Sequence, residues 1–182
     1  MAAVQARVPR QNSRRALVLD AASRLFAERG YHGTSIRDIA ADAGMTPAAI
    51  YSHFTSKAEL LVAVYAEGVG RIAAALDAAL AAPGRAGRLQ AACAAHLETL
   101  LEGGDYAQVV LRVWPRDVPE AAAQLTRLRD DYEARFRRLL PDKHLRLLLL
   151  GAMNAAPGWY RPGGETPREI ARHFLARVGA DG

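Results

Sequence analysis

Apolar residues recur at three- and four-residue spacing along most of the chain, which is the period of a helix buried on one face. In the first such segment, Ser13 is the expected N-cap, the apolar positions run on to Phe26, and Gly30 ends the helix. There is no long alternating run bounded by hairpin dipeptides, and β-branched residues are sparse, so no sheet is expected. The pattern predicts an all-α protein.

Cap and turn residues divide the rest of the chain at helical lengths. Before residue 60, the expected N-caps are Ser35 (with Asp38 as a capping box), Thr46 (with Pro47 at the first helical position) and Ser56, which opens a long helix to about residue 82. The later helices are expected at about 86–102, at 105–114, after a capping box of Asp117 with Glu120, after Asp142, and from the capping box Thr166–Glu169 to about Val178. The helix after Glu120 carries the apolar stripe Leu125, Leu128, Tyr132, Phe136 and Leu139. The total is about nine helices.

Composition narrows the class of protein. The chain has 182 residues, of which 51% are hydrophobic, so it can bury a core. Its net charge of +5 and pI near 9.8 suit a polyanionic partner. Cys93 is the single cysteine and is expected to be buried, which excludes an internal disulfide and suits a reducing cytoplasm. No secretory signal is visible, and the longest apolar run, 147–156, is too short to cross a membrane, so a soluble cytoplasmic protein without membrane contact is expected.

The stretch from Thr34 to Lys57 carries the functional signal. Two short helices joined by Ala43-Gly44-Met45 predict a helix-turn-helix at about 35–54. The second helix starts with the small residues Pro47, Ala48 and Ala49, which allow a close approach to bases, and ends with polar residues that can donate hydrogen bonds to phosphates. Tyr51 could instead be mainly a packing residue.

This stretch resembles the TetR family of bacterial regulators, through Gly30-Tyr31-His32-Gly33-Thr34-Ser35-Ile36-Arg37-Asp38-Ile39-Ala40 and the run from Gly44 to Leu61. The resemblance covers about residues 12–72. It implies an all-α homodimer whose C-terminal bundle binds a small effector and thereby loosens operator DNA. The resemblance implies that Thr34, Thr46, Tyr51, His53 and Lys57 touch the DNA backbone, while Pro47, Ala48, Ala49 and Ser52 lie nearest the bases. Ser35 completes the expected DNA-binding set. Ala48 stands where many members carry glycine.

The resemblance also divides the chain into a flexible basic arm at 1–12, a DNA-binding domain at 13–60 and an effector-binding and dimerisation domain at 61–182. Arg7, Arg10, Arg14 and Arg15 could form a minor-groove arm or simply a solvated tail. The helix around Leu145–Ala156 and the final helix are the expected dimer interface, as an antiparallel four-helix bundle.

The run from Leu149 to Gly164 resembles a TetR subgroup that often senses acyl-CoA thioesters, although Ala155 replaces an aromatic residue and Pro157-Gly158 breaks the helix. Arginines beside aromatic residues suit an apolar ligand with an anionic head, such as an acyl-CoA, or another apolar molecule. The expected effector pocket is Arg112, Trp114, Arg135, Trp159 and Arg161. Trp159 and Tyr160 could instead pack in the dimer interface.

Other classes of function have less support. The five histidines and one cysteine have no metal-ligand spacing, and no phosphate loop or nucleophile elbow is present, so neither an enzyme, a metal site nor a cofactor is expected. A structural or interaction protein that uses the same helix-turn-helix without an effector remains an alternative. The sequence leaves open the operator, the regulated genes, the effector, and whether binding represses or activates.

Overall fold

The computed structural model describes residues 10–81, 85–102 and 104–179 and is all-helical over these ranges, as predicted. The α-helices are α1 (Arg10–Arg29), α2 (Ile36–Asp42), α3 (Pro47–Tyr51), α4 (Lys57–Ala79), α5 (Arg85–Leu101), α6 (Asp105–Arg112), α7 (Ala122–Leu139), α8 (Lys143–Ala155) and α9 (Pro167–Arg177). Two short 3₁₀ helices, η1 (Pro115–Asp117) and η2 (Ala156–Gly158), follow α6 and α8.

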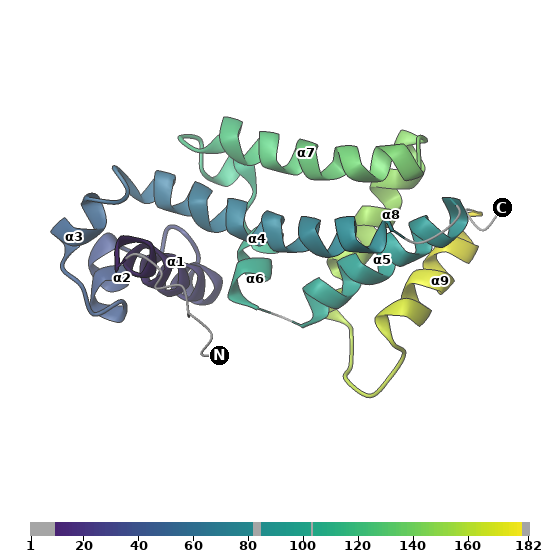
Figure 1. Cartoon of the computed structure of the whole chain (residues 1–182), viewed down its shortest axis with the longest axis horizontal. Helices are drawn as coiled ribbons and strands as arrows, with labels where there is room; N and C mark the ends of the chain where they lie inside the picture. Colours follow the sequence, from purple (N-terminus) through teal and green to yellow (C-terminus); the bar gives the residue numbers. More distant parts are fainter. Residues whose placement is uncertain (1–9, 82–84, 103, 180–182) are drawn as a thin grey trace, which may run out of the picture.

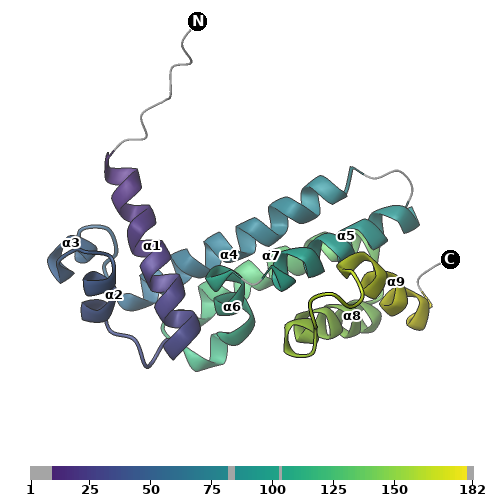
Figure 2. The same ribbon diagram turned by 90° about the horizontal axis from the view of Figure 1, so that it is seen from below.

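The molecule is elongated, and α4 runs along its length as a spine (Figure 1). Helices α1, α2 and α3 gather at one end of α4, whereas α5, α8 and α9 lie at the other, and α7 runs beside α4 (Figures 1 and 2). Helices α2 and α3, which form the predicted helix-turn-helix, therefore lie at one tip of the molecule.

Two apolar cores correspond to these two ends. The first joins α1, α2, α3 and the start of α4 to α6 and the start of α7, and Phe26, Ile39 and Tyr65 are among its fully buried side chains. The second joins the end of α4 to α5, α8, α9 and the end of α7, around Phe136 and Met153. Leu125, Phe136 and Leu139 of the predicted stripe on α7 are buried, and Leu128 and Tyr132 are half-buried. Because α4 contributes to both cores, it links the two ends mechanically.

The close approach of α4 to α6 depends on Gly68. A Cβ at this position would lie 2.7 Å from Cγ2 of Val110 and 2.8 Å from the carbonyl oxygen of Tyr106. Both distances are shorter than a van der Waals contact, and one of the two atoms belongs to the backbone. Glycine therefore sets the spacing of the two helices.

Most of the predicted caps are confirmed. Ser35 and Thr166 form capping boxes with Asp38 and Glu169. Thr46, Ser56 and Asp142 each accept a hydrogen bond from the backbone N–H three residues later. Each cap satisfies a donor that a helix start leaves without an intrahelical partner.

Two predicted helix starts are wrong. Helix α1 begins at Arg10, three residues before Ser13, so residues 10–12 of the expected arm are helical; the rest of the arm, with Arg7, lies outside the described residues. The capping box of Asp117 with Glu120 does not form, because Asp117 ends η1 and α7 starts at Ala122 without a side-chain cap. The Glu120 carboxylate accepts a hydrogen bond from the Tyr31 hydroxyl instead, at 2.9 Å.

Cys93 lies on α5 inside the second core and is fully buried, as expected. Burial raises the pKa of its thiol to about 12. Within the described ranges, no helix is both long and apolar enough to cross a membrane.

Candidate nucleic-acid interface and interior cavity

The turn between α2 and α3 allows the two helices to form a helix-turn-helix. Gly44 lies in it at φ +63°, a conformation that glycine adopts without the steric cost of a Cβ. The apolar residues Ile39, Ile50 and Phe54 are buried against α1 and α4. The pair is therefore fixed from behind, and its outer face is left to solvent.

The outer face of α3 lies at the tip of the molecule (Figure 1). Thr46, Pro47, Ala48, Tyr51 and Ser52 are exposed, whereas Ala49 and His53 are half-buried. Tyr51 is 53% exposed, which argues against its being mainly a packing residue. Small residues at the start of α3 leave its backbone accessible.

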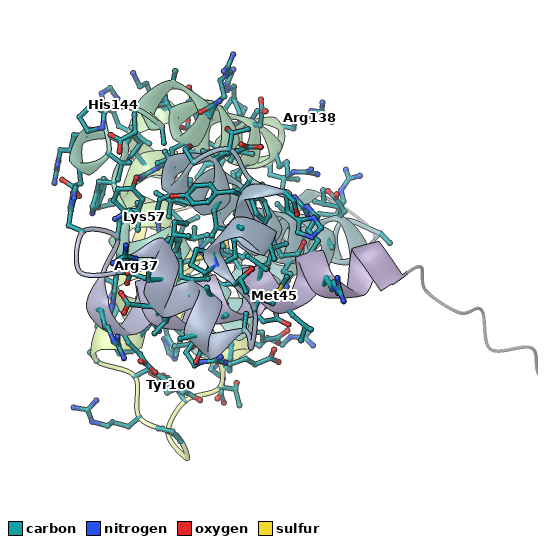
Figure 3. All side chains as sticks on the ribbon, turned by 90° about the vertical axis from the view of Figure 1, so that its left-hand side faces the viewer. Arg37, Met45, Lys57, Arg138, His144 and Tyr160 are labelled. Carbon is teal, nitrogen blue, oxygen red and sulfur yellow. The ribbon has the colours of Figure 1, made fainter. Side chains whose placement is uncertain are left out.

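A shallow hollow lies beside α3 and is lined by His32, Gly33, Thr34, Ser35, Ile36, Arg37, Asp38, Tyr51 and Lys57. Figure 3 faces this end of the molecule, with Arg37 and Lys57 labelled there. Both are cations, and Tyr51 adds a hydroxyl. The hollow has the chemistry of a phosphate-binding surface. Arg37 was not among the residues predicted from the sequence, although its place between the cap Ser35 and the buried Ile39 could have indicated it.

Lys57 is partly engaged within the protein. Its Nζ donates to the carbonyl oxygens of Tyr31 and Thr34, both at 2.9 Å, and lies 4.2 Å from the centroid of the Tyr31 ring. An ammonium group has three N–H donors, so one is left for a phosphate. Lys57 therefore fastens the start of α4 to the loop before α2.

The Thr34 hydroxyl is not placed to donate to a phosphate. It is 2% exposed and lies 3.1 Å and 2.9 Å from the carbonyl oxygens of Leu25 and Gly30, to which it donates. The single hydroxyl proton is used at the end of α1. Thr34 is thus a structural residue of the turn.

Two serine hydroxyls also have internal acceptors. The Ser35 hydroxyl donates to the Asp38 carboxylate at 2.6 Å, and hydrogen bonds from Ser35 lower the pKa of that carboxyl. The Ser52 hydroxyl donates to the carbonyl oxygen of Ala49 at 2.7 Å. Both residues are exposed, so their remaining lone pairs and the nearby backbone stay accessible.

Arg14 and Arg15 of the predicted arm are exposed on α1. The Arg15 guanidinium carbon lies 5.1 Å from the centroid of the Phe54 ring, next to α3. These residues are therefore part of a helix beside the helix-turn-helix.

A cavity of about 630 Å³ lies between α4, α5, α6, α7 and α8, and it is open to solvent, since Trp114, Leu147 and Asn154 on its lining are exposed. Its apolar wall consists of Val69, Ile72, Leu100, Val110, Leu111, Trp114, Leu147, Leu150, Gly151 and Ala155. Its polar wall consists of Tyr65, His96, Arg129, Asp130, Tyr132, Glu133 and Asn154. The volume is within the usual range of small-molecule sites.

The pocket predicted from the sequence is not assembled: of its five residues, only Trp114 lines the cavity. The Arg112 guanidinium donates to the carbonyl oxygen of Ala27, and that of Arg135 pairs with Asp77. Trp159 packs edge-on against Phe174, and Arg161 donates to the carbonyl oxygen of Tyr160. These arginines lie close in sequence to aromatic residues but not on the cavity lining, because each guanidinium pairs with an acceptor elsewhere.

The cavity has a cation that the sequence did not single out. The Arg129 guanidinium carbon lies 4.4 Å from the centroid of the Trp114 ring, and that of Arg116 lies 4.9 Å from the same ring. On the same wall, Glu133 pairs with the buried Arg146 at 2.9 Å. Arg129 is thus the cation available to a ligand on the lining.

A hydrogen-bonded chain of three polar side chains closes the other part of the wall. His96 Nδ1 lies 2.6 Å from the Tyr132 hydroxyl, and its Nε2 lies 3.1 Å from Oδ1 of Asn154. Burial lowers the pKa of His96 to about 4, against the smaller opposing effect of the Asn154 hydrogen bond. His96 is therefore neutral at physiological pH.

Hydrogen bonds tie the helix-turn-helix end to the segments around the cavity. Beside the Tyr31–Glu120 bond, His32 Nε2 lies 2.9 Å from the carbonyl oxygen of Asp117, on the η1 segment that follows Trp114. The Tyr106 hydroxyl donates to Asp20 at 2.8 Å, joining α6 to α1. These contacts join the α1–α3 end to the segments around the cavity.

Comparison with known proteins agrees with this arrangement. A model described as bacterial regulatory proteins, tetR family, matches residues 18–64, and one described as a tetracyclin repressor-like C-terminal domain matches residues 85–178. The transcriptional activator FasR of Mycolicibacterium smegmatis is 40% identical over 74 residues, which cover 41% of this chain and 33% of FasR. The transcriptional repressor KstR2 of Mycobacterium tuberculosis is 48% identical over 50 residues, which cover 28% of this chain and 25% of KstR2. The matches thus span a third or less of these curated relatives.

Solved structures match over nearly the full chain. The crystal structure of the superantigen PfiT has a TM-score of 0.79 and 30% identity and covers 93% of this chain and 98% of its own. The crystal structure of AibR in complex with isovaleryl coenzyme A and operator DNA has a TM-score of 0.73 and 23% identity, covering 92% and 98%. The second likeness shows a shared fold.

Proposed function

Because the chain belongs to the tetR family of bacterial regulatory proteins, which are DNA-binding transcription regulators and not enzymes, we propose that it is a ligand-responsive repressor. In this proposal a homodimer binds a palindromic operator, and a small effector releases it. The observation that carries the proposal is the exposed outer face of α3 beside a hollow that contains Arg37, Tyr51 and Lys57.

The division of labour follows the two ends of the molecule. Residues 13–60 bind DNA, with Thr46, Tyr51, His53 and Lys57 at phosphates and Pro47, Ala48, Ala49 and Ser52 nearest the bases. Residues 61–182 bind the effector and form the dimer. The first core also includes α6 and the start of α7, so a movement of α6 would be felt by the DNA-binding end.

The proposed dimer interface is formed by α8 and α9. Leu147 and Leu148 on α8 are 44% and 60% exposed, and Trp159 just beyond it is 46% exposed. Leu147 also lines the cavity, so Leu148 and Trp159 are the large apolar side chains left for a partner, and such exposed residues are typical of a contact surface. A two-fold axis through this surface would present two copies of α3 to successive turns of DNA.

The proposed effector is an amphipathic molecule whose apolar body fills the cavity and whose anionic head lies near Arg129, and an acyl-CoA has this form. The apolar lining and the stacked Arg129 and Trp114 support this chemistry. AibR, whose structure contains isovaleryl coenzyme A and operator DNA, has the same fold. Repression is proposed by similarity to KstR2, whereas FasR is an activator.

The test starts with selection of a binding duplex from a random library by the wild-type protein. The selected sequence should be palindromic, with half-site centres about 34–36 Å apart or a multiple of it. Arg37→Ala should weaken binding, whereas Arg137→Ala, which removes an exposed arginine near the end of α7 and outside the proposed dimer interface, should not. Failure to select any duplex would refute the DNA-binding role.

The effector is tested by titrating short-, medium- and long-chain acyl-CoAs into the protein–duplex complex and following release by fluorescence anisotropy. Release by at least one chain length, with a rise in melting temperature, is expected. If an uncharged apolar compound releases the duplex and no acyl-CoA does, the proposal that the effector has an anionic head is refuted. If nothing apolar binds, the protein acts without an effector.

A further inference from the structure

The hydrogen-bonded chain on the cavity wall crosses three helices: His96 comes from α5, Tyr132 from α7 and Asn154 from α8. His96 is 3% exposed, and its ring also packs against Phe136 with the centroids 5.9 Å apart. The imidazole is therefore held in one orientation by packing and by a hydrogen bond at each nitrogen. All three side chains line the cavity.

The partners determine where the protons lie. Oδ1 of Asn154 is an acceptor only, so Nε2 of His96 must carry the proton that bridges the 3.1 Å between them. Nδ1 of the neutral ring is then an acceptor, and the Tyr132 hydroxyl donates to it across 2.6 Å. The direction of hydrogen bonding runs from Tyr132 through His96 to Asn154.

This direction orients the Asn154 amide. With Oδ1 turned to His96, the amide has two N–H donors on Nδ2, and within the described residues no acceptor is found for them. Asn154 is exposed, and its neighbours on the lining, Leu150 and Ala155, are apolar. In the free protein water can accept from these N–H groups, and a ligand that displaces this water must supply an acceptor in its place or leave an oriented donor unpaired.

We infer that Asn154 is a specificity-determining residue that donates a hydrogen bond to an uncharged carbonyl oxygen of the effector, such as that of a ketone, ester, amide or thioester. This inference rests on the proposed function, in which the cavity is the effector site. The three side chains are neutral, and Asp130 and Glu133 on the same lining disfavour an anion at this place. His96 and Tyr132 are positioning residues, because they act on the ligand only through the orientation of the amide.

The experiment compares two uncharged probes of nearly equal shape: methyl octyl ketone, which only accepts a hydrogen bond, and the corresponding secondary alcohol, which also donates. Binding is followed by the fluorescence of Trp114, which lines the cavity, in a Trp159→Phe background that removes the other tryptophan. Wild-type protein should bind both probes, because the Asn154 N–H groups can donate to either oxygen.

Asn154→Asp changes the hydrogen-bonding character at nearly constant shape. The carboxylate still accepts from His96 but has no donor, so affinity for the ketone should fall by about 10-fold relative to the alcohol. Gln124→Glu, the same change of amide to carboxylate at an exposed position of α7 away from the lining, should leave the ratio of the two affinities unchanged. A merely structural role for Asn154 would weaken both probes alike.

Each result has one meaning. An unchanged affinity ratio in Asn154→Asp, or failure of the wild-type cavity to bind the ketone, overturns the inference. Either result leaves the proposed regulator intact if an acyl-CoA releases the duplex. Conversely, a shifted ratio with no release of the duplex by any bound ligand supports the inference and refutes effector control of DNA binding.

Discussion

Lys57→Ala separates two roles that the structure assigns to one side chain. In the structure the ammonium group holds two carbonyl oxygens of the loop before α2 and stacks on Tyr31. Lys57 also lines the hollow beside α3, and its third N–H has no acceptor among these contacts. Removing the side chain should therefore lower both the stability of the protein and its affinity for DNA.

The loss of stability follows from the contacts. A hydrogen bond from a charged donor contributes about 1.5–3 kcal/mol, and a cation–π contact at an exposed site about 0.5–1 kcal/mol. Lys57 is half-buried, so the lower end of each range applies, and two hydrogen bonds with one cation–π contact sum to about 3.5 kcal/mol. For a chain of this size that lowers the melting temperature by roughly 7–14 °C.

The effect on DNA is limited by the single free donor. Lys57 can neutralise one phosphate, so the slope of log affinity against log salt should decrease in magnitude by about 0.9. Base preference should not change, because a phosphate contact carries no sequence information. Thermal unfolding followed by circular dichroism, and anisotropy over a salt series with the selected duplex, measure the two effects.

Lys143→Ala is the matched control, since it removes the chain's other lysine from an exposed position at the start of α8. It should change neither quantity. If Lys57→Ala has the same melting temperature as Lys143→Ala, the hydrogen bonds from Lys57 to the two carbonyl oxygens do not stabilise the loop, contrary to the prediction. A changed base preference with an unaltered salt slope would show that Lys57 does not contact a phosphate.

Three further predictions concern stability. The pKa of His96 is lowered to about 4 in the folded protein, against about 6.5 in an unfolded chain. As the pH falls, the unfolded state therefore takes up a proton first, and the free energy of unfolding should drop by about 3 kcal/mol from pH 6.5 to 4. Denaturant titrations of His96→Gln should show a smaller drop between these two pH values. Arg146→Ala leaves Glu133 and the carbonyl oxygen of Leu140 without their buried donor and should cost about 3–5 kcal/mol in urea unfolding; a loss under 1 kcal/mol would mean that water replaces the guanidinium. Gly68→Ala should destabilise by about 1–3 kcal/mol, whereas Gly70→Ala, on the same helix with open space around it, should stabilise by about 0.5–1 kcal/mol; equal effects would refute the close approach of α4 and α6.

Features that depend on near neighbours could be predicted from the sequence. The caps Thr46, Ser56 and Thr166 satisfy backbone donors three residues away, so their spacing alone is informative. Asp117 and Glu120 have the same spacing but form no capping box. The Glu120 carboxylate instead accepts a hydrogen bond from the hydroxyl of Tyr31, which lies 89 residues earlier in the sequence. Local pattern determines a cap only where no distant partner competes for the side chain.

The cavity could not be predicted in the same way. Its hydrogen-bonded chain joins His96 to Tyr132, 36 positions later, and to Asn154, 58 positions later. These residues lie on three separate helices, and no spacing in the sequence indicates that they meet. Arg112 lies two residues before Trp114 along the chain, yet its guanidinium contacts α1 and is not on the cavity lining. Which cation lies at the cavity is decided by the rotation of α7 that brings Arg129 onto Trp114.

The burial of Cys93 makes the chain suitable for site-specific labelling. A thiol whose pKa is near 12 has almost no thiolate at neutral pH, and the thiolate is the form that alkylating reagents attack. A cysteine introduced at the exposed Ala48 of α3 would therefore take a spin label alone, without removal of the native cysteine. In a homodimer, the distance between two such labels would measure the separation of the α3 helices with and without an effector.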